Sequence, residues 1–193
     1  MTTALSLRAA EPRDAADLAI LVDLASHGFA TWLWYGAVMR GEADTALEQG
    51  RARMLMDDEP GAWKDATVAE WNGEIAGASI GYELDESVRD MVPAHPVIKP
   101  LLDLQVEVIG SRFIDSLCVY RHHRRKGIGQ ALLALEMVKA RGGRVSLITE
   151  SHNETALSLY AASGFAEKAR LPAVPLFEDS KRHEWVLLAR NMS

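Results

Sequence analysis

Cysteine is almost absent from this chain, since Cys118 is the single one among 193 residues. One cysteine cannot form an internal disulfide, so the fold has to rest on its hydrophobic core, and redox chemistry is not expected. No apolar run approaches the roughly 18 residues of a membrane span. The first residues, MTTALSLRAAEPRD, lack the basic start and apolar core of a signal peptide. We therefore expect a cytoplasmic protein without a membrane contact.

Positive charge is also scarce. The 21 lysines and arginines are outnumbered by 27 aspartates and glutamates, which gives a net charge of −6. Such a surface repels phosphates, and basic stripes with interleaved aromatics are missing, so nucleic acid is not an expected partner. The six histidines show no paired spacing with carboxylates, so no metal is predicted. A cationic small molecule or peptide amine is the more natural guest, although net charge also serves solubility.

The remaining composition is that of a folded protein. Hydrophobic residues make up 48% of the chain and charged residues 25%. A chain of this length can bury a sizeable core, so we expect a single domain over residues 1–193.

The first half predicts a strand, helices and a hairpin. We expect a strand at 3–8, a helix starting near Pro12, and further helices at 29–39 and 45–56. Strands at 67–71 and 74–82 flank Asn72-Gly73, a dipeptide typical of a type I′ hairpin turn.

An insertion at 84–110 follows the hairpin. It contains three prolines and then an amphipathic stretch, and it is too long for a hairpin loop. We expect a short helix there, and its apolar side is a candidate contact for a homodimer.

The second half alternates strand and helix, with glycines at the helix ends. Gly142-Gly143 is expected to end the first helix and Gly164 the second. An α/β domain around one mixed sheet follows. The expected strands are 113–119, 144–149, 165–169 and 183–189, and the expected helices are 128–140 and 154–162.

A basic loop joins the strand at 113–119 to the next helix, and it reads Arg124-Arg125-Lys126-Gly127-Ile128-Gly129 before Gln130. Free backbone N–H groups and the positive end of the helix dipole converge there, so we expect a phosphate ligand. A P-loop would need Gly-Lys-Ser/Thr, and a dinucleotide fingerprint would need a third glycine and a downstream acid. Neither is present. An isolated Gly-x-Gly is also compatible with a simple tight turn and a solvated cationic rim.

Two motifs resemble one family. Arg124, Gly127 and Gly129 match the GNAT acetyltransferase signature Arg/Gln-x-x-Gly-x-Gly/Ala position by position. Downstream, the run from Asn153 through Tyr160 to Gly164-Phe165 resembles the family's Asn-x-x-Ala-x-x-x-Tyr-x-x-x-Gly-Phe element. The resemblance covers 113–165 closely and the rest in outline. It implies a GNAT fold, with a mixed, mostly antiparallel sheet that is splayed at the cofactor strands and flanked by helices.

The resemblance also implies acetyl-CoA as cofactor and assigns residues to it. Pantetheine is expected to pair with the strand backbone, the loop to hold the pyrophosphate, and Tyr160 to protonate the departing sulfur while the Val119 N–H polarises the thioester carbonyl. The cofactor-binding set is Leu117, Cys118, Val119, Arg124, Arg125, Lys126, Gly127, Ile128, Gly129, Gln130, Asn153 and Tyr160.

Several of these residues have a second interpretation. Tyr160 can be a packing aromatic, and Asn153 is a preferred helix N-cap. Cys118 in a strand is far more often a small buried hydrophobe than a nucleophile. Trp32, Trp34 and Tyr35 either line the acceptor pocket or pack in the core.

The general base is the least determined residue. Asp115 lies two residues before Leu117 and can take a proton through water, while Glu150 and Glu70 are weaker candidates and some family members use water alone. The expected function is acetyl transfer from acetyl-CoA to a primary amine by direct attack in a ternary complex. The alternative is a non-catalytic acyl-CoA-binding sensor or interaction module. The acceptor stays open.

Overall fold

The computed structural model describes residues 5–140 and 143–192, so Thr3, Ala4 and Gly142 of the predicted elements lie outside the described residues. By its contacts the chain divides into two compact units. The first runs to Tyr82 and resumes at Asp115–Glu136. The second comprises Glu83–Ile114 and the chain from Met137 onward. The prediction of a single domain stays a prediction.

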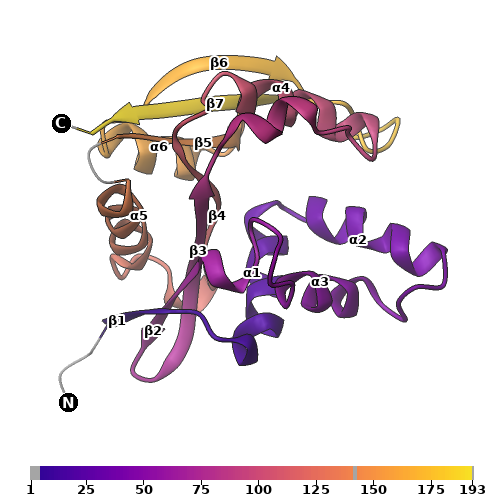
Figure 1. The fold of residues 1–193 in the computed structure, drawn as a ribbon. Coiled ribbons are helices and arrows are strands. Elements are labelled where there is room, and N and C mark those ends of the chain that lie inside the picture. The colour runs from indigo at the N-terminus through magenta and orange to yellow at the C-terminus, as the bar shows by residue number, and fades with distance from the viewer. Residues whose placement is uncertain (1–4, 141–142, 193) are drawn as a thin grey trace. The chain divides into compact units, whose positions relative to one another are not determined.

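The N-terminal part of the chain alternates strands and helices much as expected. Its helices α1, α2 and α3 lie beside one another (Figure 1), because α3 packs against both α1 and α2. In chain order the elements are β1 (Leu5–Ala9), the 3-10 turn η1 (Pro12–Asp14), α1 (Ala15–Ala25), α2 (Phe29–Met39), α3 (Ala46–Met54), the 3-10 turn η2 (Trp63–Asp65), β2 (Ala66–Trp71) and β3 (Glu74–Glu83).

The rest of the chain contains the insertion and the alternating strand-helix region. Two elements, β4 and α5, run from one unit into the other. The elements are the 3-10 turns η3 (Glu86–Asp90) and η4 (Pro96–Ile98), α4 (Lys99–Val106), β4 (Arg112–Val119), the 3-10 turn η5 (Arg121–His123), α5 (Ile128–Lys139), β5 (Arg144–Glu150), α6 (Glu154–Ala162), β6 (Ala166–Pro172) and β7 (Glu184–Asn191).

The seven strands follow the order β1-β2-β3-β4-β5-β7-β6. The pairs β1–β2, β2–β3, β5–β7 and β6–β7 are antiparallel, whereas β4 and β5 pair in parallel over Arg112–Ile114. This mixed, mostly antiparallel sheet with flanking helices confirms the predicted fold class. The hairpin turn is also as predicted, since Asn72 and Gly73 both have positive φ, 55° and 85°.

The insertion packs against its own unit. It forms η3, η4 and α4, and α4 contacts β6 and β7. Five of its apolar side chains are buried, namely Leu84, Val88, Val97, Leu104 and Val108. The apolar side that suggested a subunit contact is therefore largely covered within the second unit, and the homodimer stays a prediction. No helix in the described part of the chain has the length and apolar character needed to cross a membrane.

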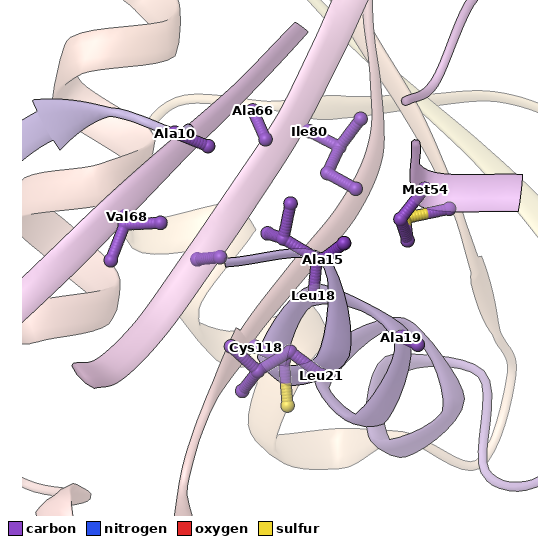
Figure 2. Close-up of a cluster of buried hydrophobic side chains, with 11 residues drawn as sticks. Ala10, Ala15, Leu18, Ala19, Leu21, Met54, Ala66, Val68, Ile80 and Cys118 are labelled. Carbon is purple, nitrogen blue, oxygen red and sulfur yellow. The ribbon is translucent and has the colours of Figure 1, made fainter. Parts of the chain in front are cut away.

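The core of the first unit fills the space between α1 and the strands β2, β3 and β4. Figure 2 shows Leu18 and Leu21 of α1 together with Ile80 of β3 and Cys118 of β4, and all four are almost fully buried. Apolar side chains recur on one face of α1 and on alternate residues of the strands, so both surfaces become apolar. Burial of this surface is the main favourable contribution to folding of the unit.

One glycine allows the close packing of α2 and α3. A Cβ on Gly50 of α3 would overlap the six-membered ring of Trp34 from α2. The pairing of a small residue with a large ring lets the two helices approach, and it places Trp34 in the core.

We predict that Gly50→Ala destabilises the protein by about 1–3 kcal/mol, because the overlap outweighs the gain of about 1 kcal/mol in helix propensity. Gly36→Ala in α2 is the matched control. Its Cβ would meet only the flexible end of Arg40 at 3.3 Å, so its stability should rise or stay unchanged. Urea unfolding measures both, and equal midpoints for the two variants would contradict the packing argument.

Candidate functional site

The end of β4 is fixed by the neighbouring strand β3. The Tyr120 amide donates to the Ala76 carbonyl at 2.8 Å. A Cβ on Gly77 would overlap the Cys118 carbonyl, so only glycine permits this backbone approach. Leu117 and Val119 are half-buried, while the Cys118 side chain points into the core.

The start of α5 is fixed by the same strand. Ile128 and Leu132 pack against Ala69 and Ala76 in a small buried cluster. One turn further along, Ser79 Oγ donates to Glu136 Oε1 at 2.9 Å, and both residues are inaccessible to solvent. Residues 76–79 of β3 therefore hold both the strand before the basic loop and the helix after it.

Two residues of the basic loop between these anchors have an unusual backbone conformation. Arg125 and Gly127 have left-handed backbone conformations, with φ values of 61° and 78°. Nothing lies within 4 Å of a Cβ built on Gly127, so the space above it is open. The Ala131 amide donates to Gly127 O at 3.0 Å as the first hydrogen bond of α5. The amides of Ile128, Gly129 and Gln130 come before this bond, have no acceptor within the helix and can donate to an anion.

Cationic side chains surround these amides. Arg124 Nε donates to Val119 O at 3.1 Å, and Lys126 Nζ lies 5.0 Å from the centre of the Trp71 ring. The side chains of Arg121 and Arg125 are exposed. Open space, free helix amides and positive charge together suit a phosphate or pyrophosphate.

Asp115 forms a polar group with two hydroxyls in the first unit. Ser116 Oγ donates to Asp115 Oδ2 at 3.1 Å, and Tyr82 of β3 also hydrogen-bonds the carboxylate. Solvent reaches Asp115, yet the surrounding protein removes much of its hydration, and this desolvation raises the pKa of the carboxyl. The two hydrogen bonds lower that pKa, and the charge of Asp65 raises it.

The phenol of Tyr82 responds to the same surroundings. Desolvation and the Asp115 charge raise the pKa of Tyr82, so its hydroxyl stays protonated and donates. The sequence reasoning missed Tyr82. Tyr82 ends the predicted strand 74–82, but only the neighbouring positions of β3 and β4 in the sheet bring it to Asp115.

Helix α6 of the second unit presents Asn153 and Tyr160. Asn153 caps the helix, with Oδ1 accepting from the Ala156 amide at 3.2 Å. The cap accounts for Asn153 structurally and leaves a cofactor role as a proposal. Tyr160 is 7% exposed, and its ring centre lies 5.8 Å from that of Phe165. The residue therefore packs as an aromatic, and a role for its hydroxyl stays a proposal.

The other candidate side chains have local partners. Burial raises the pKa of the Cys118 thiol, so its surroundings do not favour a thiolate nucleophile. Glu70 is paired with Arg8, with Oε1 and Nε 2.7 Å apart. Glu150 Oε2 lies 3.2 Å from His152 Nε2.

The aromatic residues of α2 differ in their surroundings. Trp34 packs against Gly50 and the core, and Trp32 stacks on Phe29 with ring centres 6.3 Å apart. Tyr35 is 52% exposed. The core interpretation therefore fits Trp34, and Tyr35 stays available to an acceptor. Among residues 5–140 and 143–192, no three His, Cys, Asp or Glu side chains gather as ligands for a metal ion.

The sequence of this chain matches the model of the acetyltransferase (GNAT) family over residues 31–165, which is more than half of its length. The chain belongs to this family. Its basic loop and the helix of Tyr160 lie within the matched residues. A search of curated proteins found no match for the GNAT chain.

Solved structures share the fold. An N-acetyltransferase from Staphylococcus aureus Mu50 is similar with a TM-score of 0.65 and 19% identity, over 96% of this chain and 100% of that one. A putative acetyltransferase from Salmonella typhimurium, solved with its cofactor acetyl-CoA, has a TM-score of 0.57 and 17% identity, over 98% and 95% of the two chains. The ribosomal-protein-S18-alanine N-acetyltransferase from Escherichia coli has a TM-score of 0.61 and 16% identity, with the same coverage.

We predict that Gly127→Asp abolishes binding of acetyl-CoA in this GNAT chain. The new side chain would fill the open space above residue 127 with a negative charge, where a pyrophosphate has to approach. Gly110→Asp is the matched control, because Gly110 has the same φ of 78° and equally open surroundings. Isothermal titration calorimetry should show binding for the control alone, and equal affinities would refute the assignment of the loop.

Proposed function

We propose that this GNAT chain transfers an acetyl group from acetyl-CoA to a primary amine, by direct attack of the amine within a ternary complex. The observation that carries the proposal is the loop that joins β4 to α5. It combines free helix amides, open space over Gly127 and several cations, and it is held at both ends by β3. In a GNAT chain such a loop suits the pyrophosphate of CoA.

The backbone amides and side chains present at this loop suit the chemical groups of the cofactor. The amides of Ile128, Gly129 and Gln130 would receive phosphate oxygens, and Arg124, Arg125 and Lys126 add positive charge. The backbone of Leu117, Cys118 and Val119 would pair with the amides of pantetheine, as a peptide adds to a sheet edge. When bound, acetyl-CoA supplies an activated thioester carbonyl. The Salmonella relative solved with acetyl-CoA supports this choice of cofactor.

The chain's own residues then have three tasks. The amine must lose a proton, the carbonyl oxygen must be stabilised as charge develops, and the thiolate must gain a proton. We assign the first task to Asp115, acting through water, because desolvation raises its pKa towards the working pH. The Val119 N–H is the proposed oxyanion donor, and Tyr160 is the proposed acid.

A thiol-release assay with a panel of amines tests the proposal as a whole. Purified protein is mixed with acetyl-CoA and an amine, and the release of free thiol is measured above the rate without amine. Amino acids, polyamines, aminoglycosides, peptide N-termini and protein lysines cover the candidate acceptors. Turnover with any of them supports an enzyme, whereas tight binding of acetyl-CoA without turnover favours a non-catalytic binding module.

For the acid, we predict that Tyr160→Phe lowers the turnover number by roughly 10²–10⁴-fold, the usual contribution of a positioned proton donor. The phenyl ring keeps the packing on Phe165, so the melting temperature and the Kd of acetyl-CoA should change little. Steady-state kinetics with calorimetry separate the two effects. An unchanged turnover number, where chemistry limits the rate, would show that another group protonates the sulfur.

For the base, we predict that Asp115→Asn removes one ionisation from the rising limb of kcat/KM against pH. The carboxylate form is the active one, so the wild-type rate should fall as the pH drops through the raised pKa of Asp115. Asp103→Asn, which removes an exposed carboxylate paired with Lys99, should keep the limb. A limb that survives in Asp115→Asn belongs to the amine or to another base.

A further inference from the structure

Lys126 of the basic loop is held by two side chains of the first unit. Its ammonium lies over the Trp71 ring at 5.0 Å and lies 3.2 Å from His123 Nδ1. Trp71 ends β2, and His123 ends the turn η5 that precedes the loop. An ammonium over an indole face with a ring nitrogen beside it is a favourable arrangement for a cation. Lys126 therefore connects the loop to the hairpin of β2 and β3.

The contact determines the protonation state of His123. An ammonium can only donate, so Nδ1 has to accept, and the single proton of the neutral imidazole is on Nε2. The His123 residue is 4% exposed. Its Nε2 has no hydrogen-bond partner among the described residues, and Glu74 Oε2 lies 4.0 Å away. The neutral tautomer is thus the one that fits the contact with Lys126.

The loop depends on such a contact because its backbone conformation is unfavourable. Lys126 lies between Arg125 and Gly127, both in the left-handed region. Arg125 is not a glycine, so its conformation is strained and has to be maintained by neighbouring interactions. The anchored side chain of Lys126 is in the right place to maintain it, since it fixes the residue between the two left-handed ones.

We propose that His123 is a positioning residue for cofactor binding, whose neutral imidazole holds Lys126 and the loop in the shape that accepts acetyl-CoA, and whose protonation weakens that binding. The inference rests on the proposed function, since it concerns the loop assigned to the CoA pyrophosphate. It adds a residue and a pH dependence that neither the family motif nor the loop sequence specifies.

The charges around His123 set the direction of the effect. The charge of Lys126 lies next to Nδ1, and the ring of His122 is 4.2 Å away, centre to centre. Burial, followed by His122 and Lys126, lowers the pKa of His123, while Glu74 raises it. The ring is therefore neutral at pH 7 and gains a proton only in acid. The proton removes the acceptor for Lys126 and places two positive charges side by side.

Calorimetric titration with acetyl-CoA between pH 5 and 8 tests the proposal. The Kd of the wild type should rise by about tenfold in acid, the effect of losing one hydrogen bond to a charged group. In His123→Asn the amide oxygen can accept from Lys126 near the position of Nδ1 without titrating. This variant should bind like the wild type at pH 8 and should lose the acid effect. His123→Leu has no acceptor and should bind more weakly at every pH.

Two controls remove other causes of a pH dependence. The phosphates of the ligand titrate in the same range, but identically for every variant, so only the difference between the wild type and His123→Asn counts. His122→Asn changes the adjacent exposed histidine and should keep the acid effect. Melting temperatures without ligand at each pH confirm that the variants are folded. At pH 8, where Asp115 is ionised in every protein, His123→Leu should act on the KM for acetyl-CoA rather than on kcat.

Each outcome decides the proposal. Equal pH profiles for the wild type and His123→Asn overturn the role of His123 and leave the proposed function intact. A wild-type affinity that rises in acid relative to His123→Asn also overturns it, because the charged ring would then attract the phosphates directly. If the wild type binds no acetyl-CoA at every pH tested, the proposed function and this inference both fail.

Discussion

The close backbone approach of β3 to β4 at Gly77 is the constraint on which the first unit's functional region depends. Because residue 77 has no side chain, the Cys118 carbonyl can lie against β3, and the Tyr120 amide reaches the Ala76 carbonyl. Three residues after Ala76, Ser79 binds the buried Glu136 of α5. A short segment of one strand thus sets the distance between the two ends of the basic loop. The loop itself has few backbone hydrogen bonds and takes its shape from these anchors.

In the first unit, structural and chemical tasks fall to different side chains. Side chains that face the core, such as Cys118 and Leu132, are apolar and buried. Asp115, whose pKa is raised, and His123, whose pKa is lowered, lie next to the backbone elements that the core holds in place. Functional groups supported by a rigid second layer keep their geometry with little loss of conformational entropy on binding. This arrangement explains why much of the inferred chemistry comes from strand ends and from the loop that follows one of them.

Local patterns were enough to predict most of the elements. The helices α2 and α6 have the predicted bounds, and the turn at Asn72-Gly73 has the expected positive φ at both residues. The reason is that helix periodicity, capping and turn conformation depend on residues close in sequence. The anion site around Gly127 could be predicted for the same reason, because it depends on the local backbone conformation and on the start of the next helix.

Contacts between residues that are distant in the sequence could not be predicted from local patterns. Nothing in the sequence near Asp115 indicates Tyr82, and nothing near Lys126 indicates Trp71, because these pairs depend on strand register and on the packing of a hairpin. Likewise, the sequence allows two interpretations of Trp34, and the contact of its ring with Gly50 of α3 decides between them. The aromatic count of a segment cannot distinguish a core residue from a ligand contact. Only the partner residue decides.

The division of the chain has a consequence for its biosynthesis. The first unit contains both the N-terminal residues up to Tyr82 and the later segment Asp115–Glu136. During translation, α1, α2 and α3 leave the ribosome long before β4 and α5, which complete their unit. The face of β2 and β3 that carries Ala69 and Ala76 must wait for Ile128 and Leu132 of α5, and the residues of the intervening insertion emerge first. Domains generally fold as units, and incomplete ones expose apolar surface. The nascent chain is therefore most exposed to aggregation and to chaperone binding while the insertion is being made.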